Sequence, residues 1–470
     1  MTAVRPAAAP PVPAPTPALP VPARVMDLDL DRPGGPWAPG RSGPARGPDR
    51  SVPSAVALVR RAGRPLGLVA LGPDGAADGA ADGGPDALRE RLVAAAERRF
   101  GPGADPAPAP ASASAPASAP APVDRTPPTV TVVVCTRGRT TLLGDSLRAL
   151  LRTDHPATEI LVVDNAPEDD STERLVRGLA PGRLRYLREP VPGLARARNR
   201  GLAAAHGEIV AFTDDDTLAD PGWAGALAAA FRADPRIACV TGLVVPAELD
   251  TEAQALFERY CGFGKGFAPR DWSRRADAAD PLFPFAAGRF GTGANMAFRT
   301  ATLRRLGGFD PATGAGTPTR GGEDLLAFLG VLAAGHTLAY RPEAVVWHRH
   351  RRTRTELEAQ IRGFGIGLGG YLTAAVVHRP ALLADLLRRV PAGTRYALRR
   401  ATAPTVTPAA PTVTPTASVA PAHSDGAADP RTDPALARLG RIELRGLLLG
   451  PAGYLVGRAQ DRRFRAGSRS

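Results

Sequence analysis

Three consecutive aspartates, Asp214, Asp215 and Asp216, follow directly on the apolar run 209–213. A strand that ends in three carboxylates concentrates like charge, and burying unpaired charges costs on the order of several kcal/mol each. A divalent cation would offset this cost, because Mg²⁺ and Mn²⁺ take oxygen ligands, commonly carboxylates together with substrate phosphates. The triplet therefore indicates a metal site that holds a phosphorylated substrate. The alternative is an acidic loop or the start of a helix, since aspartate caps helices.

The segments around the triplet alternate between strand and helix patterns. Four runs predict strands: Val130–Val134, Ile160–Val163, Leu184–Leu187 and Ile209–Thr213. Three segments between them predict helices: 139–152, 171–179 and 194–205. This alternation is typical of a parallel sheet with crossover helices, so we expect an α/β fold.

Polar residues stand at three of the predicted strand ends. They are Thr136 and Arg137, Asp164 and Asn165, and the aspartate triplet. Because ligands bind at the carboxyl ends of the strands in such sheets, we expect these groups to line one site.

Composition divides the chain into folded and unfolded parts. The sequence of 470 residues contains 50 prolines and 51 glycines, and Pro/Ala-rich stretches at 1–24, 102–128 and 401–435 predict disorder. Between them we expect a small N-terminal module at 25–101, with a hairpin at 52–71 and a helix at 86–100. The main domain is expected at 129–350, a helical region at 351–400, and an amphipathic helix with a basic tail at 436–470. We also expect 246–290 to be a flexible loop.

Charge and cysteine content restrict the partners and the compartment. The formal net charge is +13, but no basic stripe with interleaved aromatic residues is present, so we expect no nucleic-acid partner. Cys135, Cys239 and Cys261 are few and widely spaced, which indicates buried thiols in a reducing compartment. No secretory signal or apolar run of membrane-spanning length is visible, which favours a cytoplasmic protein.

Six segments, in this order and spacing, resemble those of inverting family 2 glycosyltransferases. They are Val132–Arg139, Val162–Asp169, Pro192–Gly201, Phe212–Thr217, Phe290–Arg299 and Gly322–Asp324. The resemblance covers about residues 125–350 and implies the GT-A nucleotide-sugar-binding fold, a Rossmann-like, mostly parallel sheet flanked by helices. It also implies Mn²⁺- or Mg²⁺-dependent transfer of a sugar from a nucleotide-diphosphate sugar. A Gln-x-x-Arg-Trp motif that many members carry is missing, which argues against a processive polymerase.

The resemblance implies which residues bind the metal. Asp214 and Asp216 occupy the positions of the family's DxD pair, with Asp216 as a metal ligand and Asp215 near the donor ribose. His348 resembles the third metal ligand of some relatives, and imidazole suits Mn²⁺ better than Mg²⁺. His350 competes for this role, and a histidine on a basic surface is the simpler alternative.

The resemblance also implies a donor pocket at the strand ends and on the following helix. Thr136, Arg137, Asp164 and Asn165 would line the nucleoside, although an Asp-Asn pair is also a common turn. Arg196 and Asn199 are three residues apart and share a helix face, where a guanidinium group suits a diphosphate. The alternative for this helix, which also carries Arg198, is a solvated charged face.

Asp324 is the candidate general base. Inverting transfer needs a carboxylate that accepts the proton of the acceptor hydroxyl, and Gly322-Glu323-Asp324 resembles the family's Glu-Asp pair. The alternative is a carboxylate that complements a helix dipole. The resemblance places Gly293, Asn295 and Glu323 on the acceptor side.

Several partners and two other functions are compatible with the residues. The acceptor could be a sugar, a lipid-linked molecule or a small molecule, in a cell-envelope glycan, lipid or natural product. The excess of positive charge would also suit peripheral contact with the anionic inner face of the cell membrane. A nucleotidyltransferase could use the same carboxylates and metal, and a non-catalytic nucleotide-sugar-binding module could keep the fold.

Overall fold

The computed structural model describes residues 19–31, 54–72, 85–101, 127–156, 158–274, 280–402 and 433–467. Most of the three segments expected to be disordered lies outside these ranges, namely 1–18, 102–126 and 403–432. The end of the first segment differs from the expectation. Leu19 and Ala23 are buried, and the Ala23 amide donates a hydrogen bond to the Leu249 carbonyl, because these apolar residues complete a core described below.

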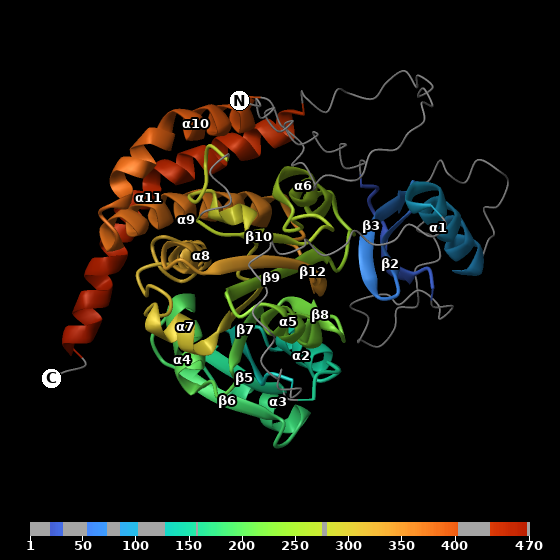
Figure 1. Cartoon of the computed structure of the whole chain (residues 1–470), viewed down its shortest axis with the longest axis horizontal. Helices are drawn as coiled ribbons and strands as arrows, with labels where there is room; N and C mark the ends of the chain where they lie inside the picture. Colours follow the sequence, from blue (N-terminus) through green and yellow to red (C-terminus); the bar gives the residue numbers. More distant parts are fainter. Residues whose placement is uncertain are drawn as a thin grey trace, which may run out of the picture.

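A nine-stranded mixed sheet forms the centre of the molecule (Figure 1). Its strand order is β10-β12-β9-β11-β7-β4-β5-β6, and β8 pairs with β12. The bounds are β4 Val130–Thr136, β5 Thr158–Asn165, β6 Leu184–Glu189, β7 Ile209–Asp214, β8 Thr217–Ala219, β9 Ile237–Pro246, β10 Arg270–Trp272, β11 Asn295–Arg299 and β12 Thr337–His348. The four predicted strands, β4 to β7, pair in parallel as expected. The antiparallel strands β8, β10 and β11 were not predicted.

Helices cover both faces of this sheet. They are α2 Thr140–Leu150, α3 Ser171–Leu179, α4 Leu194–Ala204, α5 Trp223–Ala233, α6 Glu252–Cys261, α7 Thr300–Arg305 and α8 Glu323–Ala333, with a short 3₁₀ helix η2 at Ala287–Arg289. The expectation of a flexible loop at 246–290 is wrong for α6. Thr251 and Gln254 form a capping box there, which satisfies the first amides of the helix.

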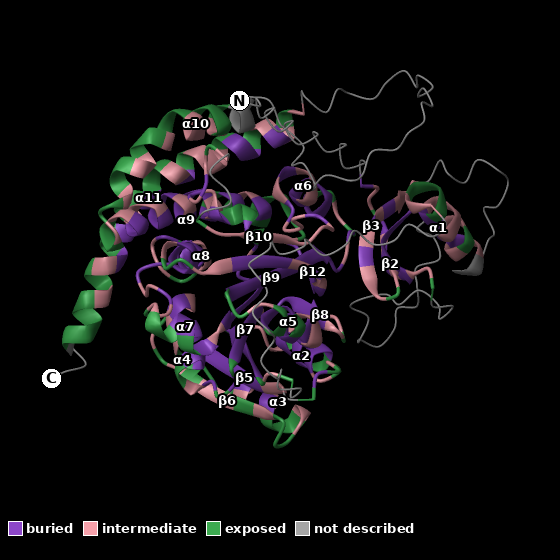
Figure 2. Cartoon of the chain, in the orientation of Figure 1, coloured by how far each residue is buried: buried purple, intermediate pink, exposed green. Residues whose placement is uncertain are grey.

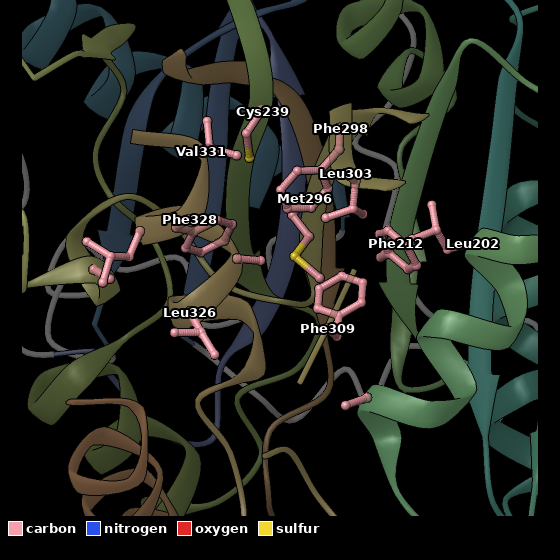
Figure 3. Packing of buried hydrophobic residues seen from close by; sticks show 14 of the residues in the cluster. Leu202, Phe212, Cys239, Met296, Phe298, Leu303, Phe309, Leu326, Phe328 and Val331 are labelled. Atoms are coloured by element: carbon pink, nitrogen blue, oxygen red, sulfur yellow. The ribbon is translucent and has the colours of Figure 1, made fainter. Parts of the chain in front are cut away.

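Strand residues alternate between two cores, as the period of a strand requires. Val133 and Phe212 face the α4, α7 and α8 side, whereas Val132 and Val134 face the α2, α3 and α5 side. Figure 3 shows the first core, where Phe212 packs edge-on against Phe309 with ring centroids 5.1 Å apart. This rigid sheet fixes the strand ends that carry the polar residues.

The N-terminal module is a three-stranded sheet, β1 Arg24–Asp29, β2 Ala55–Arg61 and β3 Arg64–Leu71, covered by α1 Pro85–Phe100. The hairpin and the helix match the prediction, but β1, which runs parallel to β2, was not predicted. Val56 and Leu58 on one face of β2 join a core with residues of the main domain. Ala57 and Val59 on the other face pack toward α1. The module therefore shares a core with the main domain.

Three helices complete the C-terminal part: α9 Arg354–His378, α10 Leu382–Thr402 and α11 Pro434–Gly467. Figure 1 shows α11 running along α9. Small residues allow this close approach, since a Cβ atom on Gly365 would lie 2.0 Å from the Glu443 carbonyl oxygen. In the part of the chain that the structure describes, no helix is both long and apolar enough to cross a membrane.

Candidate active site

The structure brings the carboxylates of the triplet into contact with side chains from β4, α4 and β12 and from the loops that follow β4 and β12. Asp214 ends β7, and Asp215 and Asp216 form the turn that leads into β8. Asp215 and Asp216 are both 5% exposed. Buried carboxylates require partners, and three arginines and a histidine supply them for the triplet: Arg139, Arg198, Arg351 and His348.

Arg139, which the sequence did not single out, holds two of the three aspartates. Its Nη1 lies 3.0 Å from Asp215 Oδ1 and 3.1 Å from Asp216 Oδ2. Arg139 directly precedes α2, three residues beyond the end of β4, so the strand end aims it into the site. Arg137, expected in the donor pocket, is exposed. The signal for Arg139 was present in the predicted strand-to-helix loop, but the sequence did not indicate which of its two arginines turns inward.

Asp216 and His348 fit a divalent cation. Asp216 Oδ1 is buried, has no hydrogen-bond partner and lies 3.4 Å from His348 Nε2. Burial lowers the pKa of His348 to about 4, so the imidazole is neutral at neutral pH and its lone pair is available to a metal. The described residues include no group of three or more His, Cys, Asp or Glu side chains arranged for a metal. Further ligands would therefore be substrate oxygens and water, as is common for Mg²⁺ and Mn²⁺.

A second layer of side chains orients His348. Its Nδ1 lies 2.9 Å from His350 Nδ1, and His350 Nε2 lies 2.6 Å from Glu258 Oε1. Such partners fix the ring of a metal-binding histidine. His350, the alternative ligand, is therefore occupied by Glu258 of α6, whereas His348 faces Asp216.

Local charges act on the aspartates in opposite directions. Burial raises the pKa of Asp215 to about 6, and the neighbouring Asp216 adds to this rise. Burial also acts to raise the pKa of Asp216, but His348, Arg139 and Arg351 outweigh it, so the pKa lies below the ordinary value. Both carboxylates are therefore mainly ionised at neutral pH, and Asp216 keeps its charge to lower pH than Asp215, which suits a metal ligand.

Arg198 is the second bridging arginine. It is 2% exposed and donates from Nη1 to Glu323 Oε1 at 2.8 Å, and from Nη2 to Asp214 Oδ1 at 3.2 Å and to the Gly293 carbonyl at 3.1 Å. The alternative of a solvated charged face is therefore wrong for this residue. The spacing of Ala195, Arg198 and Leu202 at three- and four-residue intervals could have revealed it, since this interval defines the buried face of α4.

Asp324 stands at the start of α8, next to this network. Its Oδ2 accepts from the Gly293 amide and its Oδ1 from the Leu325 amide, both at 2.8 Å. Gly322 precedes it with φ 92°, and a Cβ atom there would lie 2.5 Å from the Gly367 carbonyl oxygen, so glycine is required. The side chain is partly exposed, as a base that must reach a substrate requires.

Glu323 is buried, which differs from its expected place on the acceptor side. Burial raises its pKa to about 7, against the opposing effect of Arg198. Gly293, also expected on that side, contributes its amide to Asp324 and its carbonyl to Arg198. Both residues thus hold the candidate base and Arg198 in place.

The expected nucleoside residues lie at the ends of β4 and β5. The Thr136 hydroxyl donates to Asp215 Oδ2 at 2.8 Å, so it supports the triplet. Asp164 accepts from the Tyr186 hydroxyl at 3.0 Å, while its Oδ1 is buried without a partner. Asn165 uses both amide atoms on the loop before α4, donating to the Val191 carbonyl and accepting from the Gly193 amide. Of these residues, Asp164 retains an unsatisfied acceptor for a ligand.

Two predicted ligands belong instead to the packing of the fold. Asn199 donates to the Phe309 carbonyl and accepts from the Phe309 amide, at 2.7 and 2.8 Å. Asn295 is fully buried, accepts from Trp223 Nε1 and donates to two strand carbonyls. Both asparagines satisfy groups that would otherwise be buried without partners. The expectation that they bind the donor and the acceptor, respectively, is therefore not supported by their geometry.

Arg196 contacts the C-terminal helix α11, whereas Asn199 contacts the Phe309 backbone. Arg196 pairs with Asp461 of α11, and its guanidinium carbon lies 5.4 Å from the centre of the Phe464 ring. A pocket of about 430 Å³ opens beside it. Its lining comes from α4, α11 and the loops before α4 and α8: Val191, Pro192, Arg196, Pro311, Gly316, Thr317, Gly457, Gln460, Asp461, Arg463 and Phe464.

Comparisons with known proteins find similarity to glycosyltransferases. Residues 131–307 match the model of the family described as "Glycosyl transferase family 2". "Pre-mycofactocin glycosyltransferase" of Mycobacterium tuberculosis is 31% identical over 159 residues, which cover 34% of this chain and 30% of that protein. "Succinoglycan biosynthesis protein ExoM" of Rhizobium meliloti is 31% identical over 229 residues, 46% of this chain and 65% of that protein. The chain thus spans less than two thirds of each of these relatives.

Among solved structures, the chain is similar to the mannosyltransferase PcManGT from Pyrobaculum calidifontis, determined in complex with GDP-Man and Mn²⁺. The sequence identity is 22% and the TM-score is 0.38, with 74% of this chain and 82% of that chain covered.

Proposed function

We propose that this chain is a glycosyltransferase that inverts the configuration of the sugar it transfers. Its residues 131–307 match the model of glycosyl transferase family 2, which confirms the predicted family and the GT-A fold class. The donor is a nucleotide-diphosphate sugar and the acceptor is a hydroxyl group. One observation carries the proposal: Asp216, in the turn after β7, and His348, at the end of β12, form a buried pair, and Arg198 links Asp214 at the end of β7 to Glu323, next to Asp324.

Asp216 and His348 would hold the divalent cation, Mn²⁺ or Mg²⁺. When bound, the cation supplies charge that neutralises the leaving nucleoside diphosphate. The orphaned Asp216 Oδ1 and the neutral imidazole are the two groups that support this assignment. Arg139 and Arg351 keep Asp216 ionised and ready to bind.

The nucleoside lies against the ends of β4 and β5 in this proposal. Asp164 accepts a hydrogen bond from the base through its free oxygen, and Asp215, held by Thr136 and Arg139, lies near the ribose. Arg137 is exposed at the same edge of the sheet and attracts the anionic donor. Arg196 can contribute to binding of the donor diphosphate only after its guanidinium group separates from Asp461.

Asp324 acts as the general base. Its two backbone hydrogen bonds hold the carboxylate fixed, and its remaining lone pairs accept the proton as the acceptor oxygen attacks the anomeric carbon. The bond between this carbon and the diphosphate breaks in the same step, so the sugar inverts. Arg198 positions the base indirectly, through Gly293 and Glu323.

The acceptor belongs to a cell-envelope glycan, a lipid or a natural product, and the reaction takes place in the cytoplasm. The relatives described above are named for pre-mycofactocin and for succinoglycan biosynthesis, so acceptors of both kinds belong in the assay.

The test is an assay of donors and product. The purified protein is incubated with a panel of nucleotide sugars, with Mn²⁺, Mg²⁺ or a chelator, and release of nucleoside diphosphate is measured. We expect one donor to be turned over with a metal and not with the chelator. The anomeric configuration of the product is then read by NMR, and retention of the donor configuration would refute the inverting mechanism.

A further inference from the structure

Large hydrophobic side chains exposed in the described residues are confined to the C-terminal helices. They lie on the end of α9, on α10 and on α11: Val377, Leu383, Leu387, Val390, Tyr396, Leu398, Leu448, Leu449, Leu455, Val456 and Phe464. Scattered exposed apolar residues are normal on a protein surface, but confinement to one group of helices is not. Figure 2 shows the exposed outer sides of α10 and α11.

On α10 the exposed apolar residues form one stripe. Leu383, Leu387 and Val390 are spaced by four and three residues, so they lie on the same helix face, and they are 45%, 59% and 49% exposed. A different face is turned to the protein, where Arg389 donates to the Phe283 carbonyl. The stripe therefore points into the surroundings of the molecule.

On α11 an apolar band is bordered by arginines. Leu448 and Leu455 are seven residues apart and therefore share a face, with exposures of 74% and 60%. Leu449 and Val456 repeat the same spacing beside them and are also exposed. Four exposed arginines border the band along the helix, two before it and two after it: Arg441, Arg445, Arg462 and Arg463. The opposite face carries Gly446 and Gly450, which pack on α9.

Acidic residues of the two helices do not cancel this positive charge. Asp385 pairs with Arg389, and Asp461 pairs with Arg196 and Arg465. Glu443 accepts from the Tyr260 hydroxyl. The bordering arginines of α11 form no ion pair with the described residues. The surface is thus apolar in the middle and positive at its borders.

We propose that the outer faces of α10 and α11 form a peripheral binding surface for anionic membranes. A helix with exposed leucines and flanking arginines lies in the plane of the interface, with its side chains among the acyl chains and its guanidinium groups at the phosphates. A second copy of the chain fits less well, because a symmetric interface would bring the same arginines against each other. The surface is independent of the proposed reaction.

Vesicle flotation of the full chain tests the proposal. The vesicles contain phosphatidylcholine alone or phosphatidylcholine mixed with phosphatidylglycerol. We expect binding to the anionic vesicles, weakened by salt, and little binding to the neutral ones. Leu448→Ser and Leu455→Ser should each weaken vesicle binding by about tenfold, because each change removes part of the apolar surface that the side chain would bury in the membrane. Arg445→Gln should weaken it by about fivefold.

Matched controls keep the outcome clear. Arg174→Gln removes a comparably exposed arginine on α3 and should leave vesicle binding unchanged. Thermal unfolding should not change in any of these variants, because the altered side chains are exposed. The proposal is overturned if the chain ignores anionic vesicles, or if the double variant L448S/L455S binds them as well as the wild type. It is equally overturned if L448S/L455S dissociates a dimer that the wild type forms without lipid.

Discussion

Arg198 Nη1 lies 2.8 Å from Glu323 Oε1, although the two residues are 125 positions apart in the chain. The contact joins α4, the helix expected on the donor side of the site, to α8, which carries the candidate base Asp324. Because the same guanidinium group reaches Asp214, one buried cation connects both halves of the proposed active site.

Removal of Arg198 should be strongly destabilising. Arg198→Ala leaves Glu323 and Asp214 buried without their cation, and breaking such a pair typically costs about 3–5 kcal/mol. Denaturant unfolding measures this loss. The control is Arg200→Ala, an exposed arginine on the same helix, which should change stability by less than about 0.5 kcal/mol. Equal effects of the two substitutions would contradict the role given to Arg198.

Stability should fall as the pH rises from about 4.5 to about 7, through Glu323. Burial raises its pKa from 4.5 to about 7, so in this window the folded protein keeps a proton that the unfolded chain has released. The unfolded state then binds fewer protons, and the free energy of unfolding decreases with pH. Glu323→Gln cannot titrate and should flatten this part of the curve. An unchanged slope in the variant would show that other groups cause it.

The N-terminal module should depend on Arg60 for its attachment. Arg60 Nε lies 2.7 Å from Asp27 of the module, and Nη2 lies 2.6 Å from Asp220, which follows β8 of the main domain. Arg60→Ala leaves two carboxylates without their shared cation, so we expect a loss of about 3–5 kcal/mol in thermal or denaturant unfolding. Arg64→Ala removes a half-exposed pair with Glu343 and should cost at most about 1 kcal/mol.

The sequence predicted the parallel part of the sheet well, because β4, β5 and β7 are continuous apolar runs that must be buried on both faces. It did not predict β8 and β10, which have three residues each and owe their extended form to pairing with β12. Such pairing depends on tertiary contacts, which the local sequence pattern does not reveal. The same holds for β1, whose partner β2 lies beyond a segment of about 25 residues.

Charge was the sequence feature that pointed most directly to the proposed site. Asp216 and His348 were expected together and lie 3.4 Å apart. Asn199 and Asn295 were misassigned because a buried asparagine that serves the backbone has the same sequence signature as one that binds a ligand. Arg139 was missed because the fold, and not the residue type, determines which arginine of a loop turns inward.

Metal-dependent nucleotide binding should require Asp216. Asp216→Ala removes the carboxylate whose Oδ1 is buried without a partner, so calorimetric titration with a nucleoside diphosphate and Mn²⁺ should show the metal-dependent part of the affinity lost. Asp170→Ala, at an exposed carboxylate on the N-terminal side of α3, is the control and should bind normally. Unchanged affinity in Asp216→Ala would refute the metal assignment.

Turnover should depend on the carboxylate of Asp324. Asp324→Asn removes the basic lone pairs, and loss of a general base typically lowers the rate by about 10²–10⁴-fold. The substitution also has a structural cost, because both oxygens accept backbone hydrogen bonds and the amide nitrogen cannot replace an acceptor; one lost partner typically costs about 1–3 kcal/mol. Donor affinity and unfolding are therefore measured together with the rate.

Asp310→Asn is the matched control: its carboxylate also accepts a backbone hydrogen bond, from Ala312, together with hydrogen bonds from His378 and Tyr454. It should lose stability while keeping most of its turnover. If Asp324→Asn retains near-normal turnover, or slows only as much as Asp310→Asn, then Asp324 is not the base.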